Sequence, residues 1–461
     1  AMPPSVNHAL AGATIIANLS ASNEVIAKDE YREMLVKSQS AKLYCGYIYS
    51  DAGYGESTTD LVFAGDNMIA ENGTILARSK RFNNECVYIE LDLERLVGER
   101  KKSNTYNIVG SEKYVCVKLD MNIGDTKITR YVDKQPFVPS DDKKREKRSE
   151  EILSIQSLGL KKRLDHTHAK TAVVGVSGGL DSTLALLVTV RAFDSLNIDR
   201  KNIIAVTMPC FGTTDRTYNN AVNFANSLGV TLKEVNIKAA VNQHFADIEH
   251  DPNVYDVTYE NSQARERTQI LMDVANKSGG LVIGTGDMSE LALGWATYNG
   301  DHMSMYGVNA GVPKTLIRYL VDYEAKRTNN DILKKTLQDI LDTPVSPELL
   351  PPKDGKISQK TEHIVGPYEL HDFFLYHLMR FGSKPSKILR LAEVAFEGIY
   401  DREVILEWLK VFYRRFFAQQ FKRSCLPDGP KVGSVALSPR GDWRMPSDAS
   451  YQIWAKELET L

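Results

Sequence analysis

The strongest structural pattern in this sequence is the run Ala172-Val173-Val174-Gly175-Val176-Ser177-Gly178-Gly179-Leu180-Asp181-Ser182. Its first five residues are apolar and of strand length, and an apolar helical pattern begins at Ser182. Glycines between a strand and a helix let backbone N–H groups approach an anion, and the start of the helix adds unpaired donors and a favourable dipole. We therefore predict a phosphate-binding loop between a buried strand and a helix.

Side chains within this loop strengthen the prediction. Ser177 and Ser182 offer hydroxyl donors, and Asp181 can hold a magnesium ion on the phosphates. The loop is not of the Walker type, because the lysine that closes that motif is absent. A Gly-Gly turn after a strand is often purely structural, but two flanking serines and an internal acid favour phosphate binding. The predicted ATP-binding residues here are Gly175, Val176, Ser177, Gly178, Gly179, Leu180, Asp181 and Ser182.

Strand and helix patterns alternate around the loop. Apolar runs at 203–207, 231–237 and 281–284 predict further strands, and amphipathic segments at 150–166, from 182, at 217–228 and at 263–277 predict helices. Near-continuous apolar strands between amphipathic helices indicate a parallel sheet covered on both faces. The predicted fold class is therefore α/β, with a doubly wound parallel sheet. Residues after Pro313 are expected to be mainly helical.

Composition narrows the class of protein. The chain has 461 residues and a formal net charge of −2, with 43% hydrophobic and 25% charged residues. A nearly neutral protein has no general electrostatic attraction to nucleic acid or membrane, so neither is expected as a partner. The five cysteines form no Cys-x-x-Cys pair, which argues against a disulfide scaffold or a zinc site. No apolar run is long enough to cross a membrane, and a cytoplasmic location is expected.

The Ser-Gly-Gly-Leu-Asp-Ser segment at 177–182 resembles the loop of the ATP pyrophosphatase superfamily. That resemblance implies a Rossmann-like domain that cleaves ATP to AMP and pyrophosphate while a substrate is adenylated. NAD, GMP and asparagine synthetases share the loop with tRNA-modifying enzymes. The loop therefore indicates the type of reaction and leaves the substrate open.

A second polar cluster follows the strand at 281–284, where Gly-Thr-Gly-Asp-Met-Ser-Glu occupies 284–290. Polar residues after a buried strand are common in loops, but this cluster is similar to that of the NAD synthetases. The resemblance implies that Thr285 and Lys314 bind ATP and that Glu290 joins Asp181 as a ligand of Mg²⁺. Glu290 also borders the deamido-NAD substrate by that resemblance. Trp295 is a candidate surface for the pyridine ring, although a core tryptophan is equally compatible with the pattern.

Three other segments match the same family. Asn261 and Arg265 correspond to residues that bind deamido-NAD, whereas Glu266 and Arg267 are interpreted as an ordinary charged first turn. Ser346 lies in a segment expected near ATP, and Lys422 is expected to reach the substrate, although Phe421 replaces the family's histidine.

The glycine-rich stretch after Glu290 departs from the simplest family members. Tyr298 and Met305 stand where those members have a lysine and an aspartate. The stretch 297–301 instead resembles the larger, glutamine-dependent branch. Asp301 in this stretch is our candidate for a base that helps ammonia to lose a proton.

Residues 3–95 resemble the trailing half of a nitrilase-like amidase domain, an α/β sandwich that supplies ammonia from glutamine. Ser22 matches a glutamine-contacting position, but no residue matches the catalytic Cys, Glu or Lys. Short apolar runs predict strands at 13–19, 47–49, 66–70 and 86–90. Residues 28–43 predict a helix with Tyr31, Met34, Leu35 and Ser38 on one stripe.

Three parts are therefore expected: a partial nitrilase-like domain at 1–138, a charged linker at 139–150, and the synthetase domain at 151–461. A solvated helix is an equally good interpretation of the second half of the linker. The predicted reaction is the ATP- and Mg²⁺-dependent amidation of deamido-NAD to NAD, with ammonia as the only nitrogen source, in a homodimer or larger homo-oligomer. The alternatives are a tRNA-modifying pyrophosphatase and a catalytically inactive scaffold.

Overall fold

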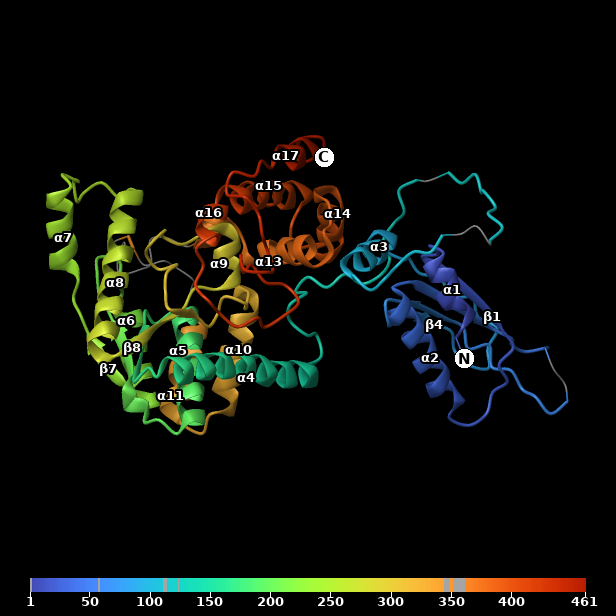
Figure 1. Ribbon diagram of the computed structural model, residues 1–461, viewed down its shortest axis with the longest axis horizontal. Helices are drawn as coiled ribbons and strands as arrows, with labels where there is room; N and C mark the ends of the chain where they lie inside the picture. Colours follow the sequence, from blue (N-terminus) through green and yellow to red (C-terminus); the bar gives the residue numbers. More distant parts are fainter. Residues whose placement is uncertain (1, 57–58, 111–113, 123, 344–348, 351–360) are drawn as a thin grey trace. The chain divides into compact units, whose positions relative to one another are not determined.

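The computed structural model describes residues 2–56, 59–110, 114–122, 124–343, 349–350 and 361–461. The chain divides into two compact units (Figure 1). Unit 1 comprises Ala1–Val132 with Phe381–Ser383, and unit 2 comprises Asp133–Arg380 with Lys384–Leu461. Each unit has its own sheet.

The sheet of unit 2 has five strands in the order β7–β6–β5–β8–β9, and every adjacent pair is parallel. The four predicted strands are confirmed as β5 (Thr171–Gly175), β6 (Ile203–Thr207), β7 (Thr231–Glu234) and β8 (Gly280–Gly284), and β9 (Tyr306–Gly307) is an addition. From β5 the chain adds β6 and β7 on one side, and β8 then returns to the other side. The switch in direction therefore lies between β5 and β8.

Helices cover both faces of this sheet. Alternate residues of β5 point into two different cores: Ala172 and Val174 pack in one, and Val173 packs in the other. The first core contains α4 (Asp142–Thr167), α5 (Leu180–Leu196), α6 (Asp215–Leu228), α10 (Lys314–Arg327) and α11 (Asp331–Leu341). The second contains α7 (Lys238–Asp247) and α8 (Val257–Ser278). The prediction of a doubly wound α/β fold is confirmed.

Residues 139–150 were interpreted as a linker, with a solvated helix as an equally good alternative for the second half, and residues 142–150 are the first turns of α4. The carboxylate of Asp141 accepts a hydrogen bond of 2.8 Å from the backbone N–H of Lys144 and so caps the helix. The charged residues remain solvated, and burial begins at Ser149. A polar run that cannot build a core can still be helical when it extends an amphipathic segment.

The last part of unit 2 is helical, as predicted. Helices α13 (Tyr368–Tyr376), α14 (Pro385–Ala395), α15 (Arg402–Ala418) and α17 (Gln452–Glu459) form a layer, drawn in orange and red in Figure 1. The short helices α12 (Thr361–Val365) and α16 (Gln420–Arg423) flank them, and α9 (Met288–Leu293) packs on α13 and α15. No helix in the described part of the chain is long and apolar enough to span a bilayer.

Unit 1 contains a four-stranded sheet in the order β1 (Ile15–Ser20), β2 (Gly46–Asp51), β3 (Met68–Glu71), β4 (Thr74–Arg78). β1 and β2 are parallel, and the other pairs are antiparallel. Helices α1 (Pro4–Leu10), α2 (Lys28–Leu43) and α3 (Leu93–Lys102) accompany the sheet. The strand predicted at 86–90 is wrong. This segment has no ladder partner among the described residues, and the Glu90 carboxylate binds Thr129 and Arg130 instead.

The helix predicted at 28–43 is confirmed as α2, but the stripe that contains Tyr31, Met34 and Leu35 is not its buried face. Tyr31, Met34 and Leu35 are 57%, 55% and 43% exposed, and the buried face consists of Arg32, Val36, Ser40 and Leu43. Arg32 can be buried because its guanidinium group forms ion pairs with Asp66, at 2.7 Å, and Glu24, at 3.0 Å. A prediction that uses only the positions of apolar residues cannot identify a buried helix face whose central residue is an arginine in an ion pair.

Candidate active site at the ends of the parallel strands

The glycine-rich loop connects β5 to α5, as predicted, and its shape depends on Gly178. This residue has φ +85°, and a Cβ added to it would lie 2.2 Å from the carbonyl oxygen of Thr217 in α6. Only glycine fits a position that combines a left-handed backbone with so close an approach. The following Gly179 is the N-cap of α5 and provides no side-chain cap. The first N–H groups of this 17-residue helix therefore point into the loop without a side-chain cap at the N-cap position.

Hydroxyl groups stabilise the loop from inside. Ser177 Oγ accepts a hydrogen bond of 3.2 Å from the backbone N–H of Gly179, and it lies 3.3 Å from Ser182 Oγ. Ser182 Oγ donates to the carbonyl oxygen of Gly179 at 3.1 Å. Ser177 is exposed and Ser182 is buried. Ser177 is therefore available to a ligand, and Ser182 mainly holds the loop in shape.

A buried amide connects the start of α5 to the loop that follows β8. Asn309 Nδ2 donates to the carbonyl oxygens of Asp181, at 2.9 Å, and Thr285, at 3.0 Å. Asn309 is completely buried, and its own carbonyl oxygen accepts from Gln156 Nε2 of α4 at 3.1 Å. Because the amide group of the buried Asn309 makes both of these bonds, Asn309 fixes the start of α5 relative to the loop after β8. Sequence patterns gave no sign of this contact, since a single Asn in a loop is common.

Three carboxylates surround one ammonium group at the switch point. Lys314 Nζ lies 2.7 Å from Asp181 Oδ2, 2.6 Å from Asp287 Oδ2 and 2.9 Å from Glu290 Oε1. Asp287 is completely buried, and its Oδ1 accepts from the backbone N–H groups of Ser289, at 2.7 Å, and Glu290, at 2.9 Å. Asp287 therefore caps α9, the helix that carries Glu290, while it also pairs with Lys314.

Burial dominates the protonation of this cluster. Burial raises the pKa of Glu290 to about 7, with Lys314 opposing the rise and Asp181 adding to it. Burial likewise raises the pKa of Asp287 well above its ordinary value. For Lys314, burial alone would lower the pKa, but the three carboxylates outweigh it and hold the pKa well above its usual value. The cluster therefore keeps its ammonium charge and has a deficit of positive charge when all three carboxyl groups are ionised.

The donor set fits a divalent cation that binds oxygen. One carboxylate oxygen from each of Asp181, Asp287 and Glu290 lies within 4.8 Å of the others. The buried Asp181 Oδ1 has no hydrogen-bond partner among the described residues. Three carboxylates and one ammonium group carry two net negative charges when ionised, which one divalent cation would neutralise. Magnesium prefers carboxylate and phosphate oxygens, so Asp181 and Glu290 at the open side of the cluster suit it.

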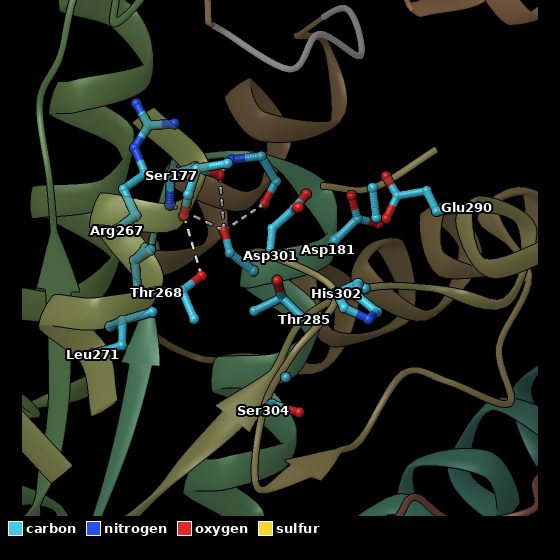
Figure 2. Close-up of a pocket in the computed structure, with 18 of the residues that line it drawn as sticks. Ser177, Asp181, Arg267, Thr268, Leu271, Thr285, Glu290, Asp301, His302 and Ser304 are labelled. Carbon is cyan, nitrogen blue, oxygen red and sulfur yellow. Dashed lines mark hydrogen bonds between the residues drawn. The ribbon is translucent and has the colours of Figure 1, made fainter. Parts of the chain in front are cut away.

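These groups border a pocket of about 300 Å³. Figure 2 shows Asp181 and Glu290 side by side, while Arg267 and Thr268 line the pocket from α8. Apolar side chains, among them Met208, Leu271 and Val282, complete the lining. The combination of an apolar wall, an anion-binding loop and an acidic cluster suits a nucleotide, whose base is apolar and whose phosphates need donors and a cation.

Most of the predicted site residues lie together in this pocket. Gly175, Val176, Ser177, Gly179, Leu180, Asp181, Ser182, Thr285, Glu290, Trp295 and Asp301 line it, and Gly178 and Lys314 lie directly behind the lining. Trp295 is half-buried, and the guanidinium group of Arg415 lies 5.3 Å from its ring. The carboxylate of Asp301 accepts a hydrogen bond of 2.6 Å from Thr297 N–H. Ser346 lies outside the described residues.

Other predicted residues contact the rim of the pocket. Asn261 Oδ1 accepts from the Thr297 hydroxyl at 2.7 Å, and Arg265 Nε donates to the carbonyl oxygen of Tyr298 at 3.3 Å. Lys422 Nζ donates to the carbonyl oxygens of Gly294 and Ala296 at 2.8 and 2.6 Å, just after α9. All three therefore hold the stretch 294–298 in this structure.

The prediction for Ser22 concerns unit 1. Its backbone N–H donates to Asp51 Oδ1 at 2.9 Å, and its hydroxyl lies 3.5 Å from a guanidinium nitrogen of Arg32.

Arg267, interpreted from the sequence as part of a charged helix turn, instead lines the pocket of unit 2. Arg267 lies three residues after Ala264, on the side of α8 that faces the pocket. The sequence alone does not predict which side of α8 this is, because that depends on how the helix packs on the sheet.

A doubly wound sheet with a glycine-rich loop and an acidic cluster at its switch point defines a class of α/β proteins that bind nucleotide phosphates. Within that class, the family model described as NAD synthase matches residues 152–401, more than half of the chain. The chain belongs to the NAD synthase family, a family of ligases, and the family inferred from the sequence motifs is confirmed.

Individual relatives agree with this assignment. The chain is 42% identical to a glutamine-dependent NAD(+) synthetase of Mycobacterium leprae, with 99% of this chain and 72% of that protein aligned. It is 29% identical to the enzyme of the same name from Aquifex aeolicus, over 95% of this chain and 71% of that protein. The crystal structure of a glutamine-dependent NAD(+) synthetase from Cytophaga hutchinsonii superposes with a TM-score of 0.56 at 21% identity, over 98% of this chain and 71% of that one. This last match supports the fold alone.

Proposed function

We propose that unit 2 converts deamido-NAD to NAD by adenylating the nicotinate carboxylate with ATP and then replacing AMP with ammonia. The observation that carries this proposal is the position of Asp181, Glu290 and Lys314 at the mouth of the phosphate loop. Attack of a carboxylate on the α-phosphorus expels pyrophosphate, so the site must align the two reactants and neutralise a large negative charge.

Different residues of this chain are suited to aligning the reactants and to neutralising the charge. The N–H groups at the start of α5 and the hydroxyl of Ser177 bind phosphate oxygens, and the ammonium of Lys314 offsets charge on the leaving pyrophosphate. Asp181 and Glu290 would hold Mg²⁺, with Asp287 behind them. When bound, the ion supplies Lewis-acid stabilisation of the phosphate oxygens. The apolar wall at Met208, Leu271 and Val282 is suited to the adenine base.

Residues at the rim of the pocket are proposed to position the substrate. Asn261, Arg265 and Lys422 shape the stretch 294–298, and Trp295 in that stretch offers an aromatic surface to the pyridine ring. Asp301 remains our candidate for the group that accepts a proton from the attacking ammonia, because its carboxylate lines the same pocket. Thr285, whose carbonyl oxygen is held by Asn309, is proposed to contact ATP.

The nitrogen source is a separate question. The relatives aligned above are named glutamine-dependent, so they give no support to ammonia as the only source. Ser22 and its neighbours in unit 1 are the residues proposed to take part in glutamine use. We propose a homo-oligomer as the assembly, on the basis of the family resemblance.

The test is to incubate the protein with deamido-NAD and Mg·ATP, with either ammonium or glutamine, and to follow NAD, AMP and pyrophosphate. The proposal requires NAD, AMP and pyrophosphate in equal amounts when ammonium is supplied. Release of ADP in place of AMP, or no NAD with ammonium, contradicts it. NAD formed with glutamine in the absence of ammonium contradicts the ammonia-only prediction without affecting the synthetase site.

A further inference from the structure

Asp372 is a buried acid outside the pocket that contacts two helices of the site. It belongs to α13 and is 1% exposed. Its Oδ1 accepts a hydrogen bond from the hydroxyl of Ser289 in α9. Its Oδ2 accepts from both the backbone N–H, at 3.0 Å, and the hydroxyl, at 2.7 Å, of Thr315 in α10. Both oxygens of one carboxylate are therefore used to join three helices.

The start of α10 depends on these contacts because it lacks a cap of its own. Its N-cap residue is Pro313, which provides no side-chain hydrogen bond. The N–H of Lys314 instead donates to Ser289 Oγ at 2.8 Å, and the N–H of Thr315 donates to Asp372. Asp372 thus caps α10 from a distant part of the chain, and its negative charge also suits the positive end of the helix dipole.

Each partner of Asp372 is adjacent in sequence to a residue of the carboxylate–ammonium cluster. Ser289 immediately precedes Glu290, and Thr315 immediately follows Lys314. Helix α13 contacts the cluster a second time through Tyr368, whose ring centroid lies 5.4 Å from Lys314 Nζ. Since Ser289 Oγ accepts from Lys314 N–H while its own proton goes to Asp372, the network is continuous from α13 to both helix starts.

We infer that Asp372 is a positioning residue, which holds Glu290 and Lys314 in register by bonding Ser289 and Thr315. This inference rests on the proposed function, because it concerns the same metal and phosphate site. Asp372 itself does not line the pocket and has no contact with the reacting atoms. Asp372 affects the reaction by keeping Glu290 and Lys314 in position, because a displacement of about 1 Å in a catalytic group can lower a rate about 100-fold.

The test is the Asp372→Asn variant, which keeps the size of the side chain and removes the charge. With ammonium as nitrogen source, we expect kcat to fall about tenfold, with the KM for deamido-NAD within about twofold of the parent. Both the Mg²⁺ concentration for half-maximal activity and the Kd for Mg²⁺, measured by titration calorimetry without substrates, should rise about fivefold. If the variant merely contained less folded protein, kcat would fall in proportion to the folded fraction and the Mg²⁺ dependence would be unchanged. An unchanged Mg²⁺ dependence in folded Asp372→Asn overturns the inference.

Two further variants make the result decisive. Thr315→Val removes one hydroxyl bond and keeps the backbone N–H, so it should shift the Mg²⁺ dependence in the same direction by about twofold. If Asp372→Asn does not fold, an unshifted Mg²⁺ dependence in Thr315→Val overturns the inference instead. Asp66→Asn is the matched control, since Asp66 is a fully buried ion-paired acid of unit 1 and should leave the Mg²⁺ dependence unchanged.

Glu290→Gln, measured in parallel, distinguishes a failure of the positioning role of Asp372 from a failure of the proposed metal site. If Glu290→Gln is inactive while Asp372→Asn has the parent's Mg²⁺ dependence, only the positioning role is wrong. If Glu290→Gln has full activity, the proposed metal site is wrong.

Discussion

The ammonium nitrogen of Lys314 lies 2.7 Å from a carboxylate oxygen of Asp181, although 133 positions separate the two residues in the chain. This contact joins the phosphate loop at the start of α5 to the start of α10. Because Lys314 also contacts Asp287 and Glu290, it stands at the centre of the acidic cluster. A change in any member of this cluster is therefore expected to affect both the bound cation and the geometry of the loop.

Removing a proposed metal ligand should abolish the first half-reaction. We expect Asp181→Asn and Glu290→Gln each to lower deamido-NAD-dependent pyrophosphate release at least about 100-fold, because the phosphate charge is no longer neutralised. Asp165→Asn, at an exposed position of α4, serves as the control and should behave like the parent. Pyrophosphate release at the parental rate in either ligand variant would remove that residue from the site.

The shape of the loop can be tested with two glycines that share a positive φ. A Cβ at Gly178, with φ +85°, would lie 2.2 Å from Thr217 O, whereas a Cβ at Gly229, with φ +74°, meets nothing within 4 Å. Both alanine variants carry a backbone strain of about 1 kcal/mol, but only Gly178→Ala must also move α6 or the loop. We expect Gly178→Ala to lose activity and Gly229→Ala to retain it. Equal activity in the two variants would show that the loop tolerates displacement.

Loss of the central ammonium should make the fold depend on a divalent cation. Lys314→Met leaves three carboxylates facing one another, and an unpaired buried charge costs about 3 kcal/mol or more. We expect the melting temperature of this variant to fall in EDTA and to rise on Mg²⁺ addition by more than that of the parent. The measurement is thermal unfolding with and without Mg²⁺. An identical Mg²⁺ effect in both proteins would place the cation elsewhere.

His371 predicts a specific pH dependence of stability. Burial lowers the pKa of this side chain from the ordinary 6.5 to about 4. Between these pH values the unfolded chain binds a proton that the folded chain does not, so stability falls as the pH falls from 6.5 to 4, by up to about 3 kcal/mol. No further loss from this residue follows below pH 4.

The measurement is the free energy of unfolding in urea at several pH values for the parent and for His371→Gln. Glutamine keeps a donor for the carbonyl oxygen of Val365, which His371 Nε2 contacts, and does not titrate. The variant should therefore lose less stability between pH 6.5 and pH 4. Parallel curves for the two proteins would contradict the pKa assigned to His371.

The parallel sheet could be predicted because its signals are local. Strands such as 203–207 are continuous apolar runs, and the loop at 175–182 combines glycines, serines and an acid in a few positions. The positions of Thr285 and Glu290 after a strand could also be predicted. The carboxyl ends of parallel strands necessarily lie at the same edge of a sheet. Their gathering in one pocket follows from that rule.

The rest of the site depends on docking between distant helices, which leaves no local pattern. Asp372 lies in an apolar helix segment and resembles a solvent-facing acid until α13 is packed on α9 and α10. Arg32 resembles a surface residue of α2, yet ion pairs allow it to be buried in place of the exposed Met34. Asn309 and Asp287 are ordinary loop residues in sequence, and only their burial reveals what they hold together.

The position of the bound cation decides whether Asp181 and Glu290 form the metal site. Crystals of the protein with Mn²⁺ in place of Mg²⁺ and a non-hydrolysable ATP analogue would give an anomalous signal at the metal. We expect a peak about 2.1 Å from carboxylate oxygens of both Asp181 and Glu290, with the triphosphate on the N–H groups at the start of α5. A metal bound elsewhere, or a triphosphate that does not touch residues 177–182, would contradict it.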